Sequence, residues 1–345
     1  MAGRRPVAEP GAGARNFSPW HAWMVELART EHVDPFPADG DADAVLAWRE
    51  RCRARLLALL GPLPGRVPLA LETLEETEGD GYLRQLVVFD SEDTMSVPAW
   101  LLLPHDRRHR GPAVLAVHGH GPGKDLVVGL DSTEAPNGDY ASQLARRGYV
   151  VLAPDLRCFG QRQDWNPPDH YACDTNLVHA TMAGQSPLTQ NLWDMARALD
   201  VLEAHELVDP DRIGVAGLSY GGTIALFLSA WDERVRAAVV SGNFSSLAES
   251  HKMPWNMCGS QILPGMLGQL EHLDLGALVA PRPLLVECGE KDDLFPATVA
   301  RAGIEKLRRV YQALGAADDL LVHDVFAGGH QWHGEEAYGF LDRLL

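Results

Sequence analysis

Short apolar runs alternate with longer amphipathic segments from residue 113 to the end of the chain. The apolar runs are four to six residues long and rich in Val, Ile, Leu and Ala: Ala113–Val117, Val150–Ala153, Ile213–Ala216, Ala237–Val240, Pro283–Glu287 and Leu320–Val325. The segments between and after them have helical periodicity: Tyr140–Arg147, Leu192–Glu206, Tyr220–Trp231, Ala297–Ala313 and Glu335–Leu345. Such alternation predicts an α/β fold, with a mainly parallel central sheet and helices on both faces.

The first hundred residues have a different pattern. Residues 1–15 are mostly Ala, Gly, Pro and Arg, and we expect a disordered tail because they offer almost nothing to bury. The pattern of residues 16–66 predicts a helical N-terminal extension, in which the helical pattern ends at Gly61–Gly65. Two strand-like runs follow, Leu83–Phe89 and Val97–Leu103. We therefore expect a single α/β domain over 16–345.

Two long connections interrupt the alternation, at residues 157–187 and 243–276. The second is rich in large apolar residues, among them Trp255, Met257, Ile262, Leu263, Met266 and Leu267. Long connections after the strands of an α/β sheet usually cover the site. We predict that 243–276 is a lid or pocket wall, with Trp255, Met257 and Met266 facing the substrate. The alternative is a peripheral segment packed on the core.

Composition excludes several classes of protein. The chain has 345 residues, 46% of them hydrophobic and 22% charged, which is typical of a soluble globular protein. Its net charge of −17 would repel nucleic acid and anionic membranes. No apolar run is long enough to cross a bilayer, and no apolar segment typical of a signal peptide follows the first arginines. We expect a cytoplasmic protein that binds a small-molecule substrate. The sequence leaves open whether the protein forms a homo-oligomer.

The five cysteines are odd in number and widely scattered, with neither a CxxC motif nor zinc-ligand spacing. This usage favours reduced thiols. A bridge between Cys158 and Cys173, within one predicted loop, stays open.

Gly217-Leu218-Ser219-Tyr220-Gly221 is a G-x-S-x-G motif between a predicted strand and a predicted helix. A serine on so sharp a turn exposes its hydroxyl, and the glycines let neighbouring segments approach. The start of the helix then directs free amides towards developing negative charge. The context favours a nucleophilic serine over one that merely caps a helix.

A nucleophilic serine needs a histidine base and a carboxylate that orients it. An acidic turn, Glu290–Asp293, follows the predicted strand at 283–287, and His330 and His333 follow the last predicted strand. Both groups are expected at the carboxyl ends of parallel strands, where open α/β sheets place their sites. Each alone is an ordinary loop feature, but together with Ser219 they stand in the order Ser, Asp, His.

At these positions the chain resembles the α/β-hydrolases, in particular the branch of dienelactone hydrolases and acetyl xylan esterases that is related to prolyl oligopeptidase catalytic domains. The resemblance covers roughly Pro98 to the C-terminus. Its marks are Val117-His-Gly-His-Gly121, Ala153-Pro-Asp-Leu-Arg157, the segment Val208–Gly222, Pro281-Arg-Pro283, Gly289-Glu-Lys-Asp292 and Gly329-His330. It implies an α/β-hydrolase fold and a serine hydrolase that needs no cofactor.

Carried over residue by residue, the resemblance implies that Ser219 is the nucleophile, Asp292 the acid and His330 the base. It also implies an oxyanion hole formed by the amides of Tyr220 and His120. The spacing from Gly289 selects Asp292 over its neighbour Asp293. Gly328 and Gly329 favour His330 over His333, because glycines let the loop turn the imidazole towards the serine.

Other polar residues near the predicted strand ends have two interpretations each. Arg157 and Arg162 would either bind a substrate carboxylate or form ion pairs with carboxylates of the protein. Lys124 is expected to be a solvated surface lysine rather than a ligand for an anionic substrate. His118, His120, His330 and His333 have ligand-like spacing, but the Asp that metallo-hydrolases carry after such a motif is missing. We therefore predict no metal and interpret these histidines as residues that stabilise loops.

We predict a serine hydrolase that cleaves a carboxylic ester, a thioester or a lactone of a small molecule through an acyl-enzyme. A peptidase is less favoured, because the residues before the core are too few for a gating β-propeller. The alternative is a lyase, cyclase or condensing enzyme that uses the same pocket, since fold does not fix function. A non-catalytic binding module would have no need of all three triad residues.

Overall fold

A computed structural model of the chain describes residues 16–37, 39–131, 138–165, 172–251 and 258–345. Within these ranges a nine-stranded sheet has the order β1-β2-β3-β5-β4-β6-β7-β8-β9. The strands are β1 Glu72–Glu78, β2 Tyr82–Glu92, β3 Met95–Pro104, β4 Gly111–Val117, β5 Val150–Pro154, β6 Val208–Leu218, β7 Ala237–Ser241, β8 Leu284–Gly289 and β9 Leu321–Phe326. The strands β4 to β9 pair in parallel, and β1 to β3 form an antiparallel extension. The predicted mainly parallel sheet is confirmed.

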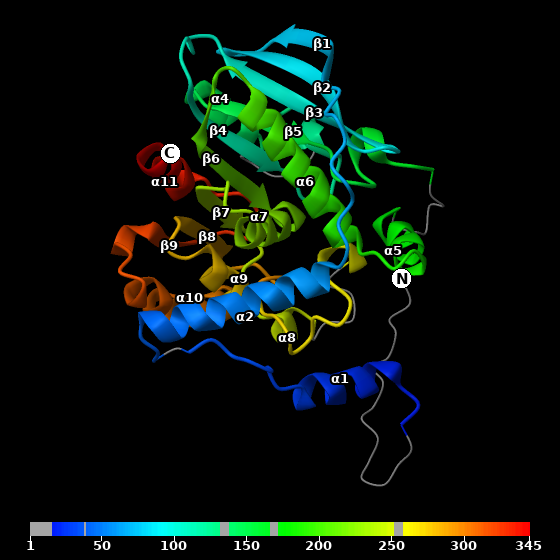
Figure 1. The fold of residues 1–345 in the computed structure, drawn as a ribbon, viewed down its shortest axis with the longest axis vertical. Helices are drawn as coiled ribbons and strands as arrows, with labels where there is room; N and C mark the ends of the chain where they lie inside the picture. Colours follow the sequence, from blue (N-terminus) through cyan, green and yellow to red (C-terminus); the bar gives the residue numbers. More distant parts are fainter. Residues whose placement is uncertain (1–15, 38, 132–137, 166–171, 252–257) are drawn as a thin grey trace.

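Helices cover both faces of the sheet (Figure 1). They are α1 Pro19–Arg29, α2 Ala42–Leu60, α3 Lys124–Val127, α4 Tyr140–Arg146, α5 Ala172–Met182, α6 Pro187–Ala204, α7 Tyr220–Trp231, α8 Leu247–Ser250, α9 His272–Val279, α10 Ala297–Ala313 and α11 Glu335–Leu344. One buried cluster joins the sheet to α2, α6, α7, α9 and α10. A second joins the opposite face to α4 and α11. The two clusters enclose the sheet as a three-layer sandwich.

The central strands are buried along nearly their whole length. All five residues of β5 and β7 and all six of β8 are buried, and α7 is buried from Tyr220 to Ala230. A helix so enclosed cannot shift without disturbing the core, because protein interiors are close-packed. The start of α7, directly after Ser219, is therefore held firmly against the sheet.

The edge strand β1 was not predicted from the sequence. Its residues, Glu-Thr-Leu-Glu-Glu-Thr-Glu, show no apolar alternation, and six of the seven are exposed. Repeated carboxylates on an edge strand oppose pairing with another chain. β1 is held by its antiparallel pairing with β2 and buries almost no side chains, which explains why its sequence has no apolar pattern.

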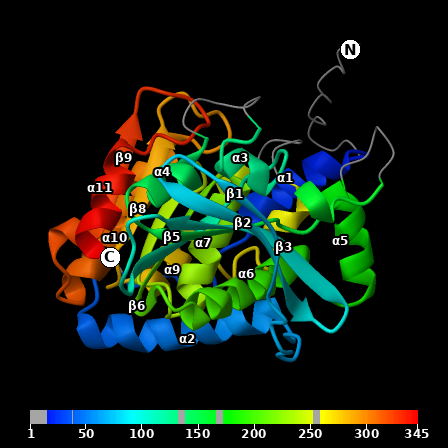
Figure 2. The same ribbon diagram turned by 90° about the horizontal axis from the view of Figure 1, so that it is seen from above.

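The N-terminal segment, predicted as a helical extension, contains the two helices α1 and α2. α2 begins after Asp41, whose side chain accepts a hydrogen bond from the Ala44 amide, and ends at Gly61, whose φ of 72° disfavours other residues. It runs along the outside of the helices that cover one face of the sheet (Figure 2). The predicted tail, 1–15, lies outside the described residues. No helix in the described ranges is long and apolar enough to cross a membrane.

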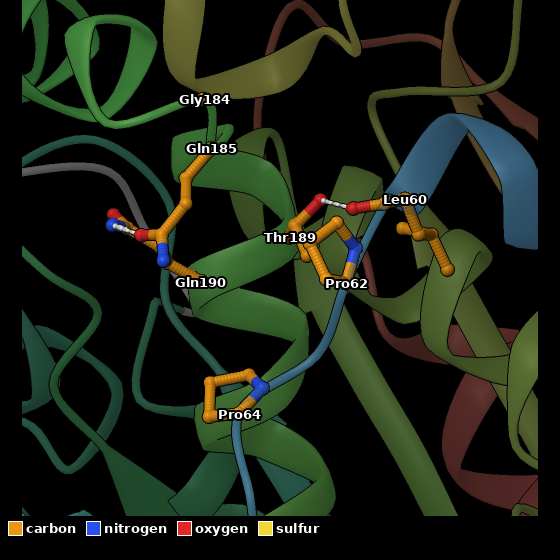
Figure 3. Close-up of a pocket in the computed structure, with 7 residues that line it drawn as sticks. All are labelled: Leu60, Pro62, Pro64, Gly184, Gln185, Thr189 and Gln190. Carbon is orange, nitrogen blue, oxygen red and sulfur yellow. Dashed lines mark hydrogen bonds between the residues drawn. The ribbon is translucent and has the colours of Figure 1, made fainter.

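A small hollow lies between the segment after α2 and the start of α6 (Figure 3). Across it, the Thr189 hydroxyl donates to the Leu60 carbonyl at 2.9 Å, and Gln190 donates to the Gln185 side chain at 2.8 Å. None of the predicted site residues lines this hollow. The bond from Thr189 to Leu60 attaches the end of α2 to the start of α6.

Trp48 tests how much the N-terminal extension contributes to stability. The side chain is 1% exposed, packs edge-on against Phe36 and donates to the Asp34 carbonyl at 2.8 Å. We expect Trp48→Ala to lower the free energy of unfolding by about 3–5 kcal/mol, as for other large buried aromatics. Leu46→Ala, on the exposed side of α2, should change it by less than about 0.5 kcal/mol. Equal denaturant midpoints for the two variants would contradict the docking of α2.

Candidate active site

Ser219 lies at the junction of β6 and α7 in a strained backbone conformation. Its φ is 59° and its ψ is −117°, angles that L-residues rarely adopt. A Cβ at Gly217 would lie 2.2 Å from the Gly221 carbonyl oxygen, and one at Gly221 would lie 2.0 Å from the Val117 carbonyl oxygen. The Ser219 amide donates to the Ser241 carbonyl at 2.9 Å. The two glycines are therefore needed for a turn this tight.

Asp292 and His330 come together from the ends of β8 and β9. The His330 Nδ1 lies 2.8 Å from Oδ2 of Asp292. The other carboxylate oxygen, Oδ1, accepts the amides of Leu294 and Phe295 at 2.9 and 3.1 Å. Asp292 is 4% exposed, whereas Asp293 is exposed. These bonds fix the carboxylate and leave one oxygen to orient the imidazole.

The turn after β8 and the loop after β9 are bonded to each other. The Lys291 amide donates to the Gly328 carbonyl at 2.8 Å, and a Cβ at Gly289 would lie 2.2 Å from the Gly329 carbonyl oxygen. Below them the buried Glu287 accepts the Gly334 amide at 2.7 Å, and burial raises the pKa of this carboxyl. The loop that carries His330 is therefore held on both sides.

The His330 ring lies close to the serine turn. A Cβ on Gly242 would stand 3.1 Å from the His330 Cε1 and 3.2 Å from the Leu218 Cδ1, so Gly242 separates the two. The ring of Phe295 stacks on the imidazole, with centroids 5.8 Å apart. The Nε2 atom is buried and has no hydrogen-bond partner among the described residues. One ring nitrogen is thus bonded to Asp292 and the other is free to take a proton.

The His118–Gly121 loop lies against the serine. A Cβ on Gly119 would come within 2.9 Å of the Leu218 carbonyl oxygen and 3.2 Å of the Ser219 Cβ. Tyr220 is the first residue of α7, a position whose amide has no acceptor within the helix. The start of α7 and this loop therefore both lie close to the serine.

His118 holds that loop in place, which is the loop-stabilising role that the sequence analysis gave as the alternative to a metal ligand. The side chain is fully buried, its Nδ1 donates to the Gly119 carbonyl at 2.6 Å, and its Nε2 accepts the Leu156 amide at 2.9 Å. Burial lowers the pKa of His118, so the ring is neutral, which these two bonds require. Only the fold brings Leu156 to this position.

The two arginines predicted near the site are engaged in ion pairs. Arg157 binds the buried Asp194 through Nε at 2.8 Å and also binds Glu92, and Arg162 contacts Asp194 at 2.8 Å. Burial by itself would raise the pKa of Asp194, but the two guanidinium groups beside it hold that pKa below its usual value. The geometry favours ion pairing over the predicted placement of Arg157 in the substrate pocket.

Lys124 corrects another expectation. The side chain is 1% exposed, and its Nζ lies 2.9 Å from Oδ2 of Asp155. The same carboxylate accepts the amides of Lys124 and Gln161 at 2.7 and 3.0 Å. The prediction of a solvated surface lysine is wrong, because Asp155 gathers the loops after β4 and β5 around a buried ion pair.

The segment 243–276 is bonded to the core where it is described. The Asn243 Nδ2 donates to the Thr223 hydroxyl at 2.7 Å, and that hydroxyl donates to Gln261 at 2.8 Å. Met266 is 5% exposed and belongs to the main core cluster. The geometry therefore places Met266 in the core rather than on a pocket surface. Trp255 and Met257 lie outside the described residues.

The four histidines with ligand-like spacing do not form one group. His118 is bonded to Leu156, His330 to Asp292, and His333 to Asp324, with an Nδ1 to Oδ2 distance of 2.7 Å. The His333 ring also stacks on Phe326, with centroids 4.4 Å apart.

All five cysteines are free thiols, so the structure has no Cys158–Cys173 bridge.

Comparison with known proteins identifies the family. The model of the dienelactone hydrolase family matches residues 98–323. The protein YtaP of Bacillus subtilis (strain 168) is 30% identical over 280 residues, which span 78% of this chain and 90% of YtaP. The chain belongs to the dienelactone hydrolase family. The resemblance noted in the sequence is confirmed, and the α/β-hydrolase fold with it.

Other proteins similar to this chain include esterases. The 4-O-methyl-glucuronoyl methylesterase 1 of Wolfiporia cocos (strain MD-104) is 25% identical over 354 residues, covering 90% of this chain and 80% of the relative. A Bacteroides fragilis protein assigned to the acetyl xylan esterases has a TM-score of 0.81 at 17% identity and covers 96% of both chains. A glucuronoyl esterase from Solibacter usitatus has a TM-score of 0.64 at 17% identity, over 88% of this chain and 93% of that one. This family member is a serine esterase-type hydrolase.

Substitution of the two adjacent aspartates distinguishes their roles. Asp292→Asn should lower kcat by about 10⁴-fold, because the imidazole loses the carboxylate that sets its tautomer and stabilises its cation. Asp293→Asn, with the same change one residue away on an exposed side chain, should keep kcat within about twofold of wild type. Steady-state kinetics on an activated ester measures both. The opposite ranking would show that Asp292 does not act on the base.

Proposed function

We propose that the protein hydrolyses a carboxylic ester of a small molecule through Ser219, His330 and Asp292. The observation that carries the proposal is the Nε2 of His330, buried and without a partner among the described residues, on a ring whose Nδ1 is held by Asp292. A buried polar atom left unpaired costs free energy. A general base that takes the serine proton needs that atom free.

In the acylation step, the Ser219 Oγ attacks the carbonyl carbon of the ester while His330 Nε2 takes the hydroxyl proton. The negative charge on the carbonyl oxygen is stabilised by the amides of Tyr220 and His120. Fixed amides are effective here because they are oriented before the charge develops. His330 then gives its proton to the leaving oxygen, the ester C–O bond breaks, and the alcohol leaves an acyl-enzyme.

In the deacylation step, water attacks the acyl carbon and gives a proton to His330. The second tetrahedral intermediate uses the same amides, and its collapse returns the proton to Ser219 and releases the carboxylic acid. Asp292 stays ionised throughout and stabilises the imidazolium in both steps. Thioesters and lactones need the same sequence of bond changes, so they fall within the proposed reaction.

The relatives suggest which esters to test first. Two of them are named for acetyl xylan and for a glucuronoyl methyl ester. In the first the sugar supplies the leaving alcohol, and in the second it supplies the acyl group. A panel should therefore contain p-nitrophenyl esters of increasing chain length, acetylated xylose and the methyl ester of glucuronic acid.

Ser219→Ala tests the proposal on this panel. Loss of the nucleophile should lower kcat by about 10⁶-fold on every substrate that the wild type cleaves. The matched control is Ser229→Ala in α7, the helix that follows Ser219. The Ser229 hydroxyl donates to the Ala225 carbonyl within that helix. This variant should retain wild-type kcat. Undiminished hydrolysis by Ser219→Ala would refute the proposed mechanism.

A further inference from the structure

A histidine and two cysteines meet beside the candidate active site. They are His120 from the loop after β4, Cys173 from α5, and Cys258 just before the short 3-10 helix Gly259–Gln261. The His120 Nε2 lies 3.0 Å from the Cys258 Sγ, and the three potential ligand atoms all lie within 4.8 Å of one another. We propose that these three side chains form a binding site for a thiophilic divalent cation such as Zn²⁺.

The distances are close to those that a bound zinc ion requires. Zn–N bonds of about 2.0 Å and Zn–S bonds of about 2.3 Å at tetrahedral angles place N about 3.5 Å from S, and S about 3.8 Å from S. A small outward shift of the Cys258 Sγ from His120 meets the first requirement. Binding makes one Zn–N and two Zn–S bonds and releases the two thiol protons to solvent.

The set of donors also suits this class of metal. Two thiolates and an imidazole favour Zn²⁺ or a softer ion over Mg²⁺ and Ca²⁺, which prefer oxygen. Three protein ligands leave a fourth position for water. Cys173 is 3% exposed, while His120 and Cys258 are partly exposed, so the site has both an anchored ligand and access from solvent.

The surroundings hold His120 in place for such a role. Its ring packs edge-on against Phe159, with centroids 5.3 Å apart, and lies 5.2 Å from the ring of Tyr220. The Tyr220 hydroxyl in turn donates to the Ser260 carbonyl at 3.1 Å, two residues beyond Cys258. The structure thus fixes the positions of two ligands through one buried tyrosine. Bound metal would join the loop after β4 to α5 and to the segment before Gly259.

A second group of donors is less suited to a metal. Glu287, Asp324 and His333 also have ligand atoms within 4.8 Å of one another. The Glu287 oxygens accept the amides of Gly334 and His333, and the Asp324 carboxylate binds the His333 ring. These bonds account for the group as a support for the loop that carries His330.

Titration of the reduced, metal-stripped full-length chain with Cd²⁺ tests the proposal. Thiolate-to-cadmium charge transfer should appear in the ultraviolet and saturate at one equivalent per chain, and added Zn²⁺ should abolish it. Cys173→Ser and Cys258→Ser should each lower affinity by at least about tenfold. Because Cys258 is only partly buried, its serine variant should keep the fold.

Cys158→Ser is the matched control, since Cys158 is a free thiol outside the three-residue group. It should keep wild-type affinity, and saturating Zn²⁺ should raise its melting temperature as it does for the wild type. Failure to saturate, wild-type affinity in both Cys173→Ser and Cys258→Ser, or an equal loss in Cys158→Ser would overturn the assignment. The readout needs no ester turnover, so it is independent of the proposed hydrolysis.

Discussion

The strained turn at Ser219 is the constraint on which the rest of the site depends. A non-glycine residue at φ 59° and ψ −117° costs about 1–3 kcal/mol, and it persists only where the surroundings enforce it. Here the fully buried helix α7 and the hydrogen bond from the Ser219 amide to Ser241 enforce it. The core therefore supplies the stability that holds the serine in a position no short peptide would keep.

The other parts of the site are fixed by buried polar groups rather than by the sheet alone. His118 orients the loop that approaches the serine, Asp155 joins two neighbouring loops through Lys124, and Glu287 supports the loop of His330. Each of these carboxylates or rings is buried, and each is satisfied by backbone amides or an opposite charge. Satisfied buried polar groups rigidify their surroundings, which suits a site that must be oriented before the reaction.

Local pattern predicted the elements that bury apolar faces. β4, β5, β7, β8, β9, α7 and α10 follow the predicted segments closely, because burial on a strand or helix leaves a periodic trace in the residues. β6 begins at Val208 and so extends well before the predicted run, Ile213–Ala216. The exposed strand β1 leaves no such trace. The ion-pair partners of Lys124 and Arg157 could not be predicted from the sequence either. Asp155 is 31 residues from Lys124 and Asp194 is 37 residues from Arg157, so only the fold brings each pair together. Cys173 and Cys258 join His120 for the same reason, through contacts between three separate segments.

Acylation of Ser219 measured in two histidine variants tests the central claim most directly. His330 binds Asp292, and its second nitrogen has no partner in the part of the chain that the structure describes. His333 instead binds Asp324 and stacks on Phe326. With a fluorophosphonate probe and peptide mapping, the wild type and His333→Ala should be labelled at Ser219, and His330→Ala should lose that labelling. Undiminished labelling of Ser219 in His330→Ala, with loss in His333→Ala, would contradict the account.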